Sequence, residues 1–349
     1  MKYFSLFSGI GGFELGINQS HENTRNTNVQ KVGRGEEGSE GEHEEGGRLH
    51  SISSKTTLPI RDRDNEHADR SFDERQPNCI GFSEIDKYAI EIYQKHFPNH
   101  KNYGDITQID ETALPDFDLL VGGFPCQAFS IAGKRGGFED TRGTLFFDIA
   151  RIIKEKQPRL LLLENVKGLL SHNQGSTFTT IISTLDELGY DCQWQVLNSK
   201  NHGVPQNRER VFIVGHLRGT SRPEVFPFRE SNELNRGKAP QGNDLAYCLQ
   251  AGNDKHRGSY IKIGKDGKTK RDQKNAATLT AGGHSGGNHS DMDLLVEQTK
   301  IRRLTPTECE RLQGFPDGWT SGLSDTQRYK CCGNAVTVNV IEDIINRLI

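Results

Sequence analysis

The sequence predicts an α/β protein with a doubly wound, mostly parallel sheet, helices on both of its faces, and a smaller irregular region. Short aliphatic runs recur along the chain, as at residues 117–121 and 159–163, and runs of this length are typical of strands buried on both faces. Segments with helical spacing of apolar residues follow them, as at residues 145–156 and 178–189. Glycine-rich or polar residues come directly after several runs, at the edge where open α/β sheets bind ligands.

The amino-acid composition indicates how polar and charged residues are distributed along the chain. With 349 residues there is room for one large domain and a smaller one. Hydrophobic residues make up 33% and the mean hydropathy is -0.70, so some segment must be polar and unpacked. A net charge of -3 argues against a uniformly basic surface, so any nucleic-acid contact must be a local patch. Seven cysteines without a CxxC pair fit a reducing compartment, and no apolar run reaches membrane-spanning length, which predicts a soluble cytoplasmic protein.

The first strand is predicted at residues 2–7 and runs into the sequence SGIGG at residues 8–12, followed by a short helix. Glycines after a first strand let backbone amides approach a ligand closely at a helix N-terminus. A short glycine-rich turn is weak evidence by itself, because ordinary tight turns use it as well.

Residues 20–78 interrupt the pattern with a polar insert. The insert has a single aromatic residue, Phe72, and six glutamates within residues 36–45. Such a composition buries too little apolar surface to offset the ordering of the chain, so we predict disorder. The insert could be a tolerated excursion, a binding tail or a segment foreign to the fold.

A second strand is predicted to begin at Asn78 and to end in Glu84, with Asp86 as the N-cap of a helix over residues 87–97. An acid at the end of a second strand is placed to accept hydrogen bonds from ribose hydroxyls, although an exposed carboxylate is the simpler explanation. Asp105 follows in the sequence YGDIT.

Cys126 lies in the sequence GGFPCQAFS, residues 122–130, directly after a buried strand. The glycines end the strand and Pro125 fixes the backbone just before Cys126, which places the thiol like a nucleophile at the carboxyl end of the sheet. A lone cysteine is more often a small buried hydrophobe. The loop at residues 131–143 is rich in glycine and carries Lys134, Arg135 and Arg142, as expected of a mobile loop that closes over phosphates.

Glu164 ends the next buried strand, where desolvation would raise the pKa of its carboxyl group. Arg208 and Arg210 lead into a further strand at residues 211–214, and their spacing puts both guanidiniums on the same side. Two guanidinium groups on one side suit the binding of a carboxylate, a carbonyl oxygen or a phosphate. The simpler alternative is that the strand begins with exposed basic residues.

The segment from about residue 218 to residue 296 has no regular periodicity. Residues 255–274 hold eight Lys or Arg against two Asp, and the sequence TLTAGGHSGGNHS follows. Basic and glycine-rich segments of this kind suit contacts with phosphates and grooves. His284 and His289 do not match a metal site.

A helix signal returns after this segment, with Thr305 as N-cap, Pro306 at the first helical position, Glu308 completing a capping box and Gly314 at the end. A final helix is predicted to be buried through Val340, Ile341, Ile344 and Leu348.

Eight blocks together resemble the cytosine-C5 DNA methyltransferases of bacterial or phage restriction-modification systems. They are FSGIGG, FSEID, GDIT, GGFPCQAFS, ENV, QNRER, RRLTPTE and GNAV, in the order of that family. The resemblance implies a Rossmann-like, S-adenosylmethionine-dependent catalytic domain made of residues 1–19 and 79–217 and completed by residues 330–349. It also implies a target-recognition domain at residues 218–329, and it lapses over residues 20–78.

The resemblance assigns roles to residues in these blocks. The implied catalytic residues are Cys126, Glu164, Arg208 and Arg210. The implied cofactor-binding residues are Phe7, Gly9, Ile10, Gly11, Gly12, Glu84, Ile85, Asp105, Ile106, Gly123, Pro125, Asn334 and Ala335. The implied contacts with the base and the DNA are Phe124, Gln127, Ser130, Lys134, Arg135 and Arg142.

The implied activity is methyl transfer from S-adenosyl-L-methionine, without a metal, to C5 of a flipped-out cytosine in a short specific sequence of double-stranded DNA. Attack of Cys126 on C6 would make C5 nucleophilic, and Glu164 would stabilise the negative charge that develops at N3. We expect a monomer that is the modification part of a restriction-modification system, with any cognate endonuclease acting separately. An RNA cytosine-C5 methyltransferase and a catalytically silent DNA-binding protein stay open, whereas a small-molecule methyltransferase would have no use for these residues.

Overall fold

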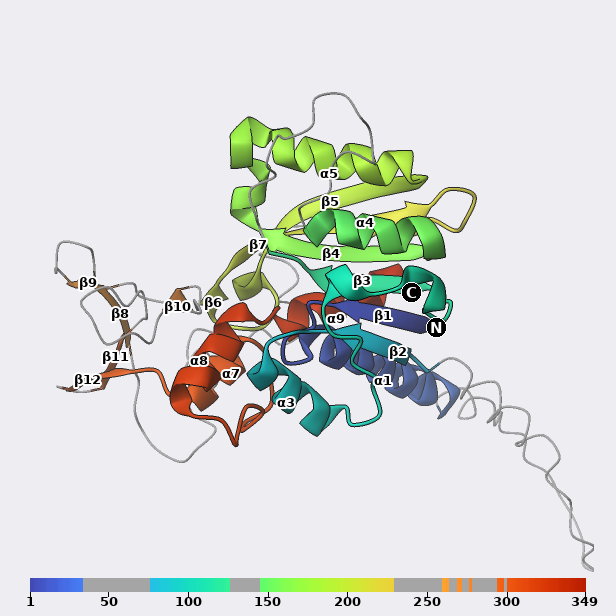
Figure 1. The fold of residues 1–349 in the computed structure, drawn as a ribbon. Helices are drawn as coiled ribbons and strands as arrows, with labels where there is room; N and C mark the ends of the chain where they lie inside the picture. Colours follow the sequence, from blue (N-terminus) through green and yellow to red (C-terminus); the bar gives the residue numbers. More distant parts are fainter. Residues whose placement is uncertain are drawn as a thin grey trace, which may run out of the picture.

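A six-stranded sheet forms the centre of the protein (Figure 1). The computed structural model describes residues 1–33, 76–125, 145–228, 259–263, 269–271, 276–277, 294–297 and 300–349. The strand order is β2-β1-β3-β4-β7-β5, in which β1 to β4 are parallel and β7 runs antiparallel to both of its neighbours. The strands are β1 Lys2–Leu6, β2 Asn78–Ser83, β3 Leu119–Gly123, β4 Leu160–Val166, β5 Tyr190–Asn198 and β7 Glu209–Leu217.

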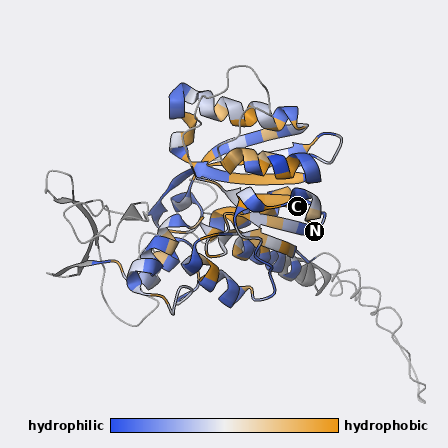
Figure 2. Cartoon of the chain, in the orientation of Figure 1, coloured by the Kyte–Doolittle hydropathy of each residue, from blue (hydrophilic) through white to orange (hydrophobic). Residues whose placement is uncertain are grey.

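Helices cover both faces of this sheet, which confirms the predicted doubly wound α/β fold. Alternate strand residues serve opposite faces: Leu120 and Leu161 pack in one buried cluster, and Leu119 and Leu160 in another. The first cluster includes α4 (Leu145–Lys156) and α5 (Ser176–Glu187), and the second includes α1 (Gly12–Gly33) and α9 (Val338–Leu348). Colouring by hydropathy shows the central strands as the apolar layer (Figure 2).

Helix α1 corrects the predicted start of the polar insert. The sequence predicts a short helix with an unpacked segment from residue 20, but α1 continues to Gly33. The middle of α1 is tied to the terminal helix, because Ser20 is buried and donates to the Asn346 side chain at 2.7 Å, and Asn23 donates to Glu342 at 2.5 Å. Hydrogen bonds from polar side chains thus attach this stretch to α9, although its low hydropathy alone predicts that it is not packed. Residues 34–75 lie outside the described residues.

The terminal helix α9 packs directly against α1. A Cβ atom built on Gly16 would lie 2.7 Å from Cβ of Ile341 and 2.9 Å from the carbonyl oxygen of Val338, so this close approach requires glycine. The predicted burial of Val340, Ile341, Ile344 and Leu348 is confirmed. The last residues of the chain therefore complete one face of a sheet that the first residues begin.

Three further helices lie beside the carboxyl edge of the sheet. They are α3 (Lys87–His96), α7 (Pro306–Leu312) and α8 (Asp325–Asn334). The predicted caps are confirmed: Asp86 accepts from two backbone amides at the start of α3, and Thr305 and Glu308 form a capping box at the start of α7. Helices α3 and α8 share a small buried cluster with Ile10, Phe315 and Trp319.

A second, antiparallel sheet lies away from the first one (Figure 1). Its strands, in the order β12-β11-β8-β9, are β12 Lys300–Arg303, β11 Leu294–Glu297, β8 Ser259–Ile263 and β9 Thr269–Arg271. The two-residue strands β10 (Ala276–Ala277) and β6 (Gln206–Asn207) pair in parallel, which connects this part of the chain to the segment before β7.

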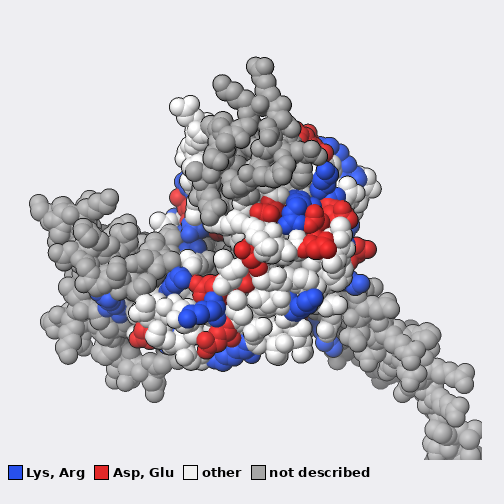
Figure 3. Space-filling view, viewed as in Figure 1, with Lys and Arg blue, Asp and Glu red and all other residues white. Residues whose placement is uncertain are grey.

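On the face shown in Figure 3, the basic and acidic side chains of the described residues are interspersed. This mixture agrees with the net charge of -3 and with the expectation that DNA contacts are local. Within the described ranges, none of the helices combines the length and the apolar character needed to span a bilayer.

Candidate active site

A cavity of about 350 Å³ lies at the carboxyl ends of the parallel strands. Its walls include residues that directly follow β1, β2 and β3 together with the last residues of β4, so it lies where the strand order reverses between β1 and β3, the usual ligand site of this architecture. The sequence-predicted residues that line it are Phe7, Gly9, Ile10, Glu84, Gly123, Phe124, Pro125, Glu164, Arg208, Arg210 and Asn334.

The turn after β1 is held by the acid that ends β2. One carboxylate oxygen of Glu84 accepts from the amide of Gly9 at 2.9 Å, and the other accepts from the amides of Ile85 and Asp86 at 2.8 and 2.9 Å. Gly9 has a φ of 56°, and a Cβ there would meet no atom within 4 Å, so the turn borders open space. Glu84 therefore organises the backbone at this end of the cavity.

Glu164 and Arg210 form an ion pair at the other end of the cavity. The Glu164 Oε1 atom lies 3.1 Å from Nε of Arg210, and their side chains are only 11% and 15% exposed. Burial raises the pKa of Glu164, and the guanidiniums of Arg210 and Arg208 oppose this rise. A carboxyl group of this kind can hold a proton or share one with a bound base.

Two contacts fix Glu164 relative to the turn that precedes Cys126. Asn165 donates from its side chain to the carbonyl of Phe124 at 2.8 Å, which ties the end of β4 to the end of β3. A Cβ on Gly123 would lie 3.1 Å from Oε2 of Glu164, so glycine leaves room for the carboxylate. The strand end that carries the acid is thus tied by a direct hydrogen bond to the residue before Pro125.

Arg208 and Arg210 differ in what they contact. Arg208 is 3% exposed, and its guanidinium donates to the carbonyls of Gly333 and Ala335, with the shortest bond 2.8 Å long. Gln206 likewise donates to the carbonyl of Leu312 at 2.7 Å. The family resemblance groups Arg208 with the catalytic residues. In the structure the hydrogen bonds of Arg208 hold Gly333 and Ala335 beside the cavity, and Arg210 is the arginine whose guanidinium pairs with Glu164.

Lys330 and Asp86 form an ion pair at the cavity wall that no sequence motif indicates. Lys330 Nζ lies 2.5 Å from Oδ2 of Asp86, which joins α8 to the N-cap of α3. The FSEID, ENV and GNAV blocks contain Asp86, Asn165, Val166 and Gly333, and the other unpredicted residues of the cavity wall lie outside the quoted blocks. The residues that line the cavity without having been predicted are Asp86, Ala89, Asn165, Val166, Lys330, Cys331 and Gly333.

Several predicted cofactor residues lie outside the cavity wall. Asp105 accepts from the amide of Thr107 and caps the short helix η1 (Ile106–Gln108), in which Ile106 is buried. Ile85 is 71% exposed beside Glu84, which leaves its side chain available to a ligand. Gly11, Gly12 and Ala335 lie behind the wall, and ideal Cβ atoms on the two glycines would meet Phe97 and Val336.

The predicted nucleophile and most predicted DNA contacts lie outside the described residues. These are Cys126, Gln127, Ser130, Lys134, Arg135 and Arg142. Pro125, which directly precedes Cys126, lines the cavity. In the part of the chain that the structure describes, His, Cys, Asp and Glu form no group able to hold a metal ion, and His284 and His289 are not among these residues.

Comparisons with known proteins agree with this arrangement. The model of the C-5 cytosine-specific DNA methylase family matches residues 68–349. The Type II methyltransferase M1.ScrFI of Lactococcus lactis subsp. cremoris is 44% identical over 282 residues, which cover 76% of this chain and 71% of that protein. The Type II methyltransferase M.HhaI of Haemophilus parahaemolyticus is 38% identical over 283 residues, which cover 76% of this chain and 86% of that protein.

Solved structures show the same fold at lower sequence identity. The S. pombe Dnmt2 methyltransferase superposes with a TM-score of 0.64 at 18% identity, over 99% of this chain and 97% of that one. A Spodoptera frugiperda DNMT2 superposes with a TM-score of 0.58 at 17% identity, over 99% of both chains. The family match over most of the chain and its close relatives lead to one conclusion: this chain belongs to the C-5 cytosine-specific DNA methylase family and is a DNA (cytosine-5-)-methyltransferase.

Proposed function

We propose that the protein transfers a methyl group from S-adenosyl-L-methionine to C5 of a flipped-out cytosine in a short sequence of duplex DNA, through a covalent bond between Cys126 and C6. The observation that carries this proposal is the buried Glu164–Arg210 pair, which shares one cavity with Pro125 and with the turn held by Glu84. We further propose that residues 218–329 recognise the target sequence and that the enzyme is the cytoplasmic, monomeric modification part of a restriction-modification system.

The residues at the Glu84 end of the cavity fit S-adenosylmethionine. Glu84 offers a carboxylate to the ribose hydroxyls, Ile10 and Phe7 offer apolar surface, and Asn334 offers an amide. When bound, S-adenosylmethionine supplies an electrophilic methyl group as part of a sulfonium. The protein's task at this end is to hold that methyl group near C5 and to exclude water.

At the other end, the protein's residues activate the base. The Cys126 thiolate attacks C6 of cytosine, and the negative charge that develops reaches N3. Glu164 donates a proton or a strong hydrogen bond to N3, and Arg210 keeps this carboxyl group oriented. C5 thereby becomes an enamine-like carbon that accepts the methyl group, after which loss of the C5 proton and of the thiolate releases the product.

The test is transfer of labelled methyl to unmethylated duplex DNA, followed by mapping of 5-methylcytosine at single-base resolution. We expect label at one short recurrent sequence, none with Cys126→Ser, and a large loss of turnover with Glu164→Gln. Calorimetry with S-adenosylhomocysteine checks that both variants still bind the cofactor product. Label on RNA alone, or full turnover by Cys126→Ser, contradicts the proposal.

A further inference from the structure

A second cavity, of about 300 Å³, lies on the same edge of the sheet, beside the active site. The two cavities adjoin along two neighbouring strands: Val166 and Arg210 line the first, and the next residues, Lys167 and Glu209, line the second. Val166 and Arg210 are partners in the strand register, so this boundary is a paired position of β4 and β7. The second cavity therefore adjoins the Glu164–Arg210 end of the first.

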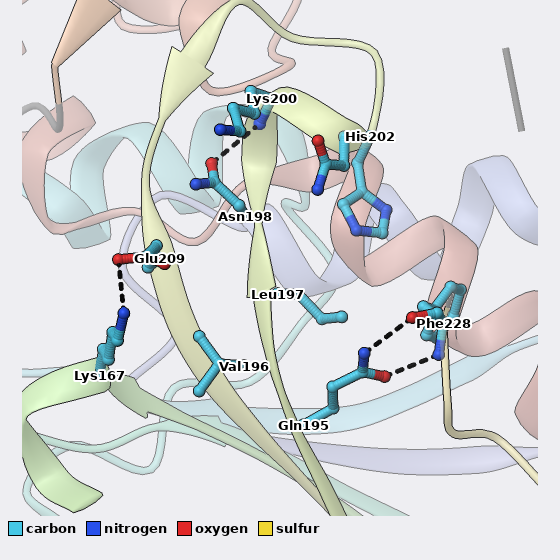
Figure 4. Close-up of a pocket in the computed structure, with 10 residues that line it drawn as sticks. Lys167, Gln195, Val196, Leu197, Asn198, Lys200, His202, Glu209 and Phe228 are labelled. Carbon is cyan, nitrogen blue, oxygen red and sulfur yellow. Dashed lines mark hydrogen bonds and ion pairs between the residues drawn. The ribbon is translucent and has the colours of Figure 1, made fainter. Parts of the chain in front are cut away.

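The second cavity has a polar rim over an apolar floor (Figure 4). Lys167 and Glu209 are paired at 2.9 Å on one side, and Lys200 stands with Asn198 on another. Val196 and Leu197 lie between the Lys167–Glu209 pair and Phe228. The far end is closed where the Gln195 side chain exchanges hydrogen bonds of 2.8 and 2.7 Å with the backbone of Phe228.

Lys200 gives this rim its net positive charge. The charge of Lys167 is balanced by Glu209, whereas Lys200 is exposed and has no carboxylate within ion-pair distance among the residues that the structure describes. Its backbone position is fixed, because Oδ1 of Asn198 accepts from the Lys200 amide at 3.3 Å. The Asn198 amide group in turn donates to Asn207 at 2.7 Å. An ammonium group on a fixed turn is thus presented to a ligand outside.

We propose that this cavity binds a backbone phosphate of the DNA strand that carries the target cytosine, with Lys200 as the charged contact and the Asn201 amide beside it. The inference rests on the proposed function. A base that is flipped into the active site remains attached to its sugar, so the flanking phosphates stay at the mouth of that cavity. Lysine and asparagine side chains are common partners of such phosphates, which position the strand without reading its sequence.

The salt dependence of DNA binding tests this contact directly. The dissociation constant of a duplex that contains the target sequence is measured between 50 and 300 mM KCl (about sixfold in salt) for the wild type, Lys200→Gln and Lys200→Arg. Each phosphate contact contributes roughly 0.9 to the slope of log K against log salt. We expect Lys200→Gln to reduce the slope by about 0.9 and to raise the KM for DNA, and Lys200→Arg to restore the wild-type slope.

Lys2→Gln is the matched control, because it removes one exposed lysine at the start of β1, on the opposite edge of the sheet. Binding of S-adenosylhomocysteine and the melting temperature serve as measures of structural damage. An unchanged slope for Lys200→Gln, or a fall in cofactor affinity and stability that parallels the fall in DNA affinity, overturns the inference. If the wild type fails to methylate DNA, the proposed function fails with it; if the wild type methylates DNA and the slope is unchanged, only the phosphate site fails.

Discussion

Glu14 allows a quantitative test of the packing beneath the turn that follows β1. It lies in the first turn of α1 and is completely buried, and its Oε1 atom accepts a hydrogen bond of 3.0 Å from the Tyr93 hydroxyl. Burial raises the pKa of Glu14 to about 7, against hydrogen bonds that lower it, including those from Ser5 and Tyr93. The carboxyl group is therefore protonated in the folded protein at mildly acidic pH.

The change Glu14→Gln replaces the protonated carboxyl with a neutral amide of the same shape that still accepts from Tyr93. A folded pKa of about 7 against 4.5 in the unfolded chain corresponds to about 3 kcal/mol at 1.36 kcal/mol per pH unit. Because the folded pKa is the higher one, this stability is present below pH 4.5 and is lost as the pH rises to 7. The wild type should lose it over this range, and the variant should not.

Urea unfolding at pH 5 and pH 8 measures the difference. We expect the variant to be within about 1 kcal/mol of the wild type at pH 5 and up to about 3 kcal/mol more stable at pH 8. Glu91→Gln, which removes an exposed carboxyl from α3, is the control and should show no such change between the two pH values. A stability difference between Glu14→Gln and wild type that is the same at both pH values refutes the reasoning.

Three further predictions concern the site and the insert. Gly123→Ala places a methyl group about 3 Å from the Glu164 carboxylate, so we expect kcat to fall by roughly tenfold to a hundredfold. Phe124→Leu keeps the glycine and should lower kcat less. Steady-state methylation assays compare the two variants. Arg208→Lys cannot bond both Gly333 and Ala335 in the same way, so we expect a loss of about 2 kcal/mol in the free energy of unfolding together with weaker binding of S-adenosylhomocysteine, and unaltered calorimetric affinity would contradict this role. Replacing residues 34–75 by a flexible linker of about ten residues, which reaches about 18 Å, should preserve folding and methylation. A deletion that begins at residue 20 removes the contacts of Ser20 and Asn23 with α9, so it should lower the melting temperature.

Local signals in the sequence predicted most of the fold. Buried strands, the Asp86 and Thr305 caps and the terminal helix each depend on neighbouring residues, and the structure confirms them. The position of Glu164 at the end of β4 is local in the same sense. The residues that lie beside Glu164 depend on the order of the strands in the sheet. That order cannot be predicted from the periodicity of a single segment.

Contacts between distant segments could not be predicted from patterns. The extension of α1 depends on Asn346 and Glu342, more than 300 residues away in the chain. The Lys330–Asp86 pair joins two helices with no shared motif. Arg208 was grouped with Arg210 by spacing, yet its partners are the carbonyls of Gly333 and Ala335, which only the tertiary structure brings close.

The packing of α9 on the first strand and helix has a consequence for synthesis of the protein on the ribosome. Phe13 and Ile17 share a buried cluster with Ile341 and Ile344, so the face of the sheet that they cover stays incomplete until α9 has been synthesised. At 5 to 20 residues per second, translation from residue 1 to the end of α9 takes roughly 20 to 70 s. During nearly all of that time the nascent chain has an uncovered apolar face and lacks the segment that Arg208 holds. The active fold therefore cannot be completed before α9 has been synthesised and has packed against α1.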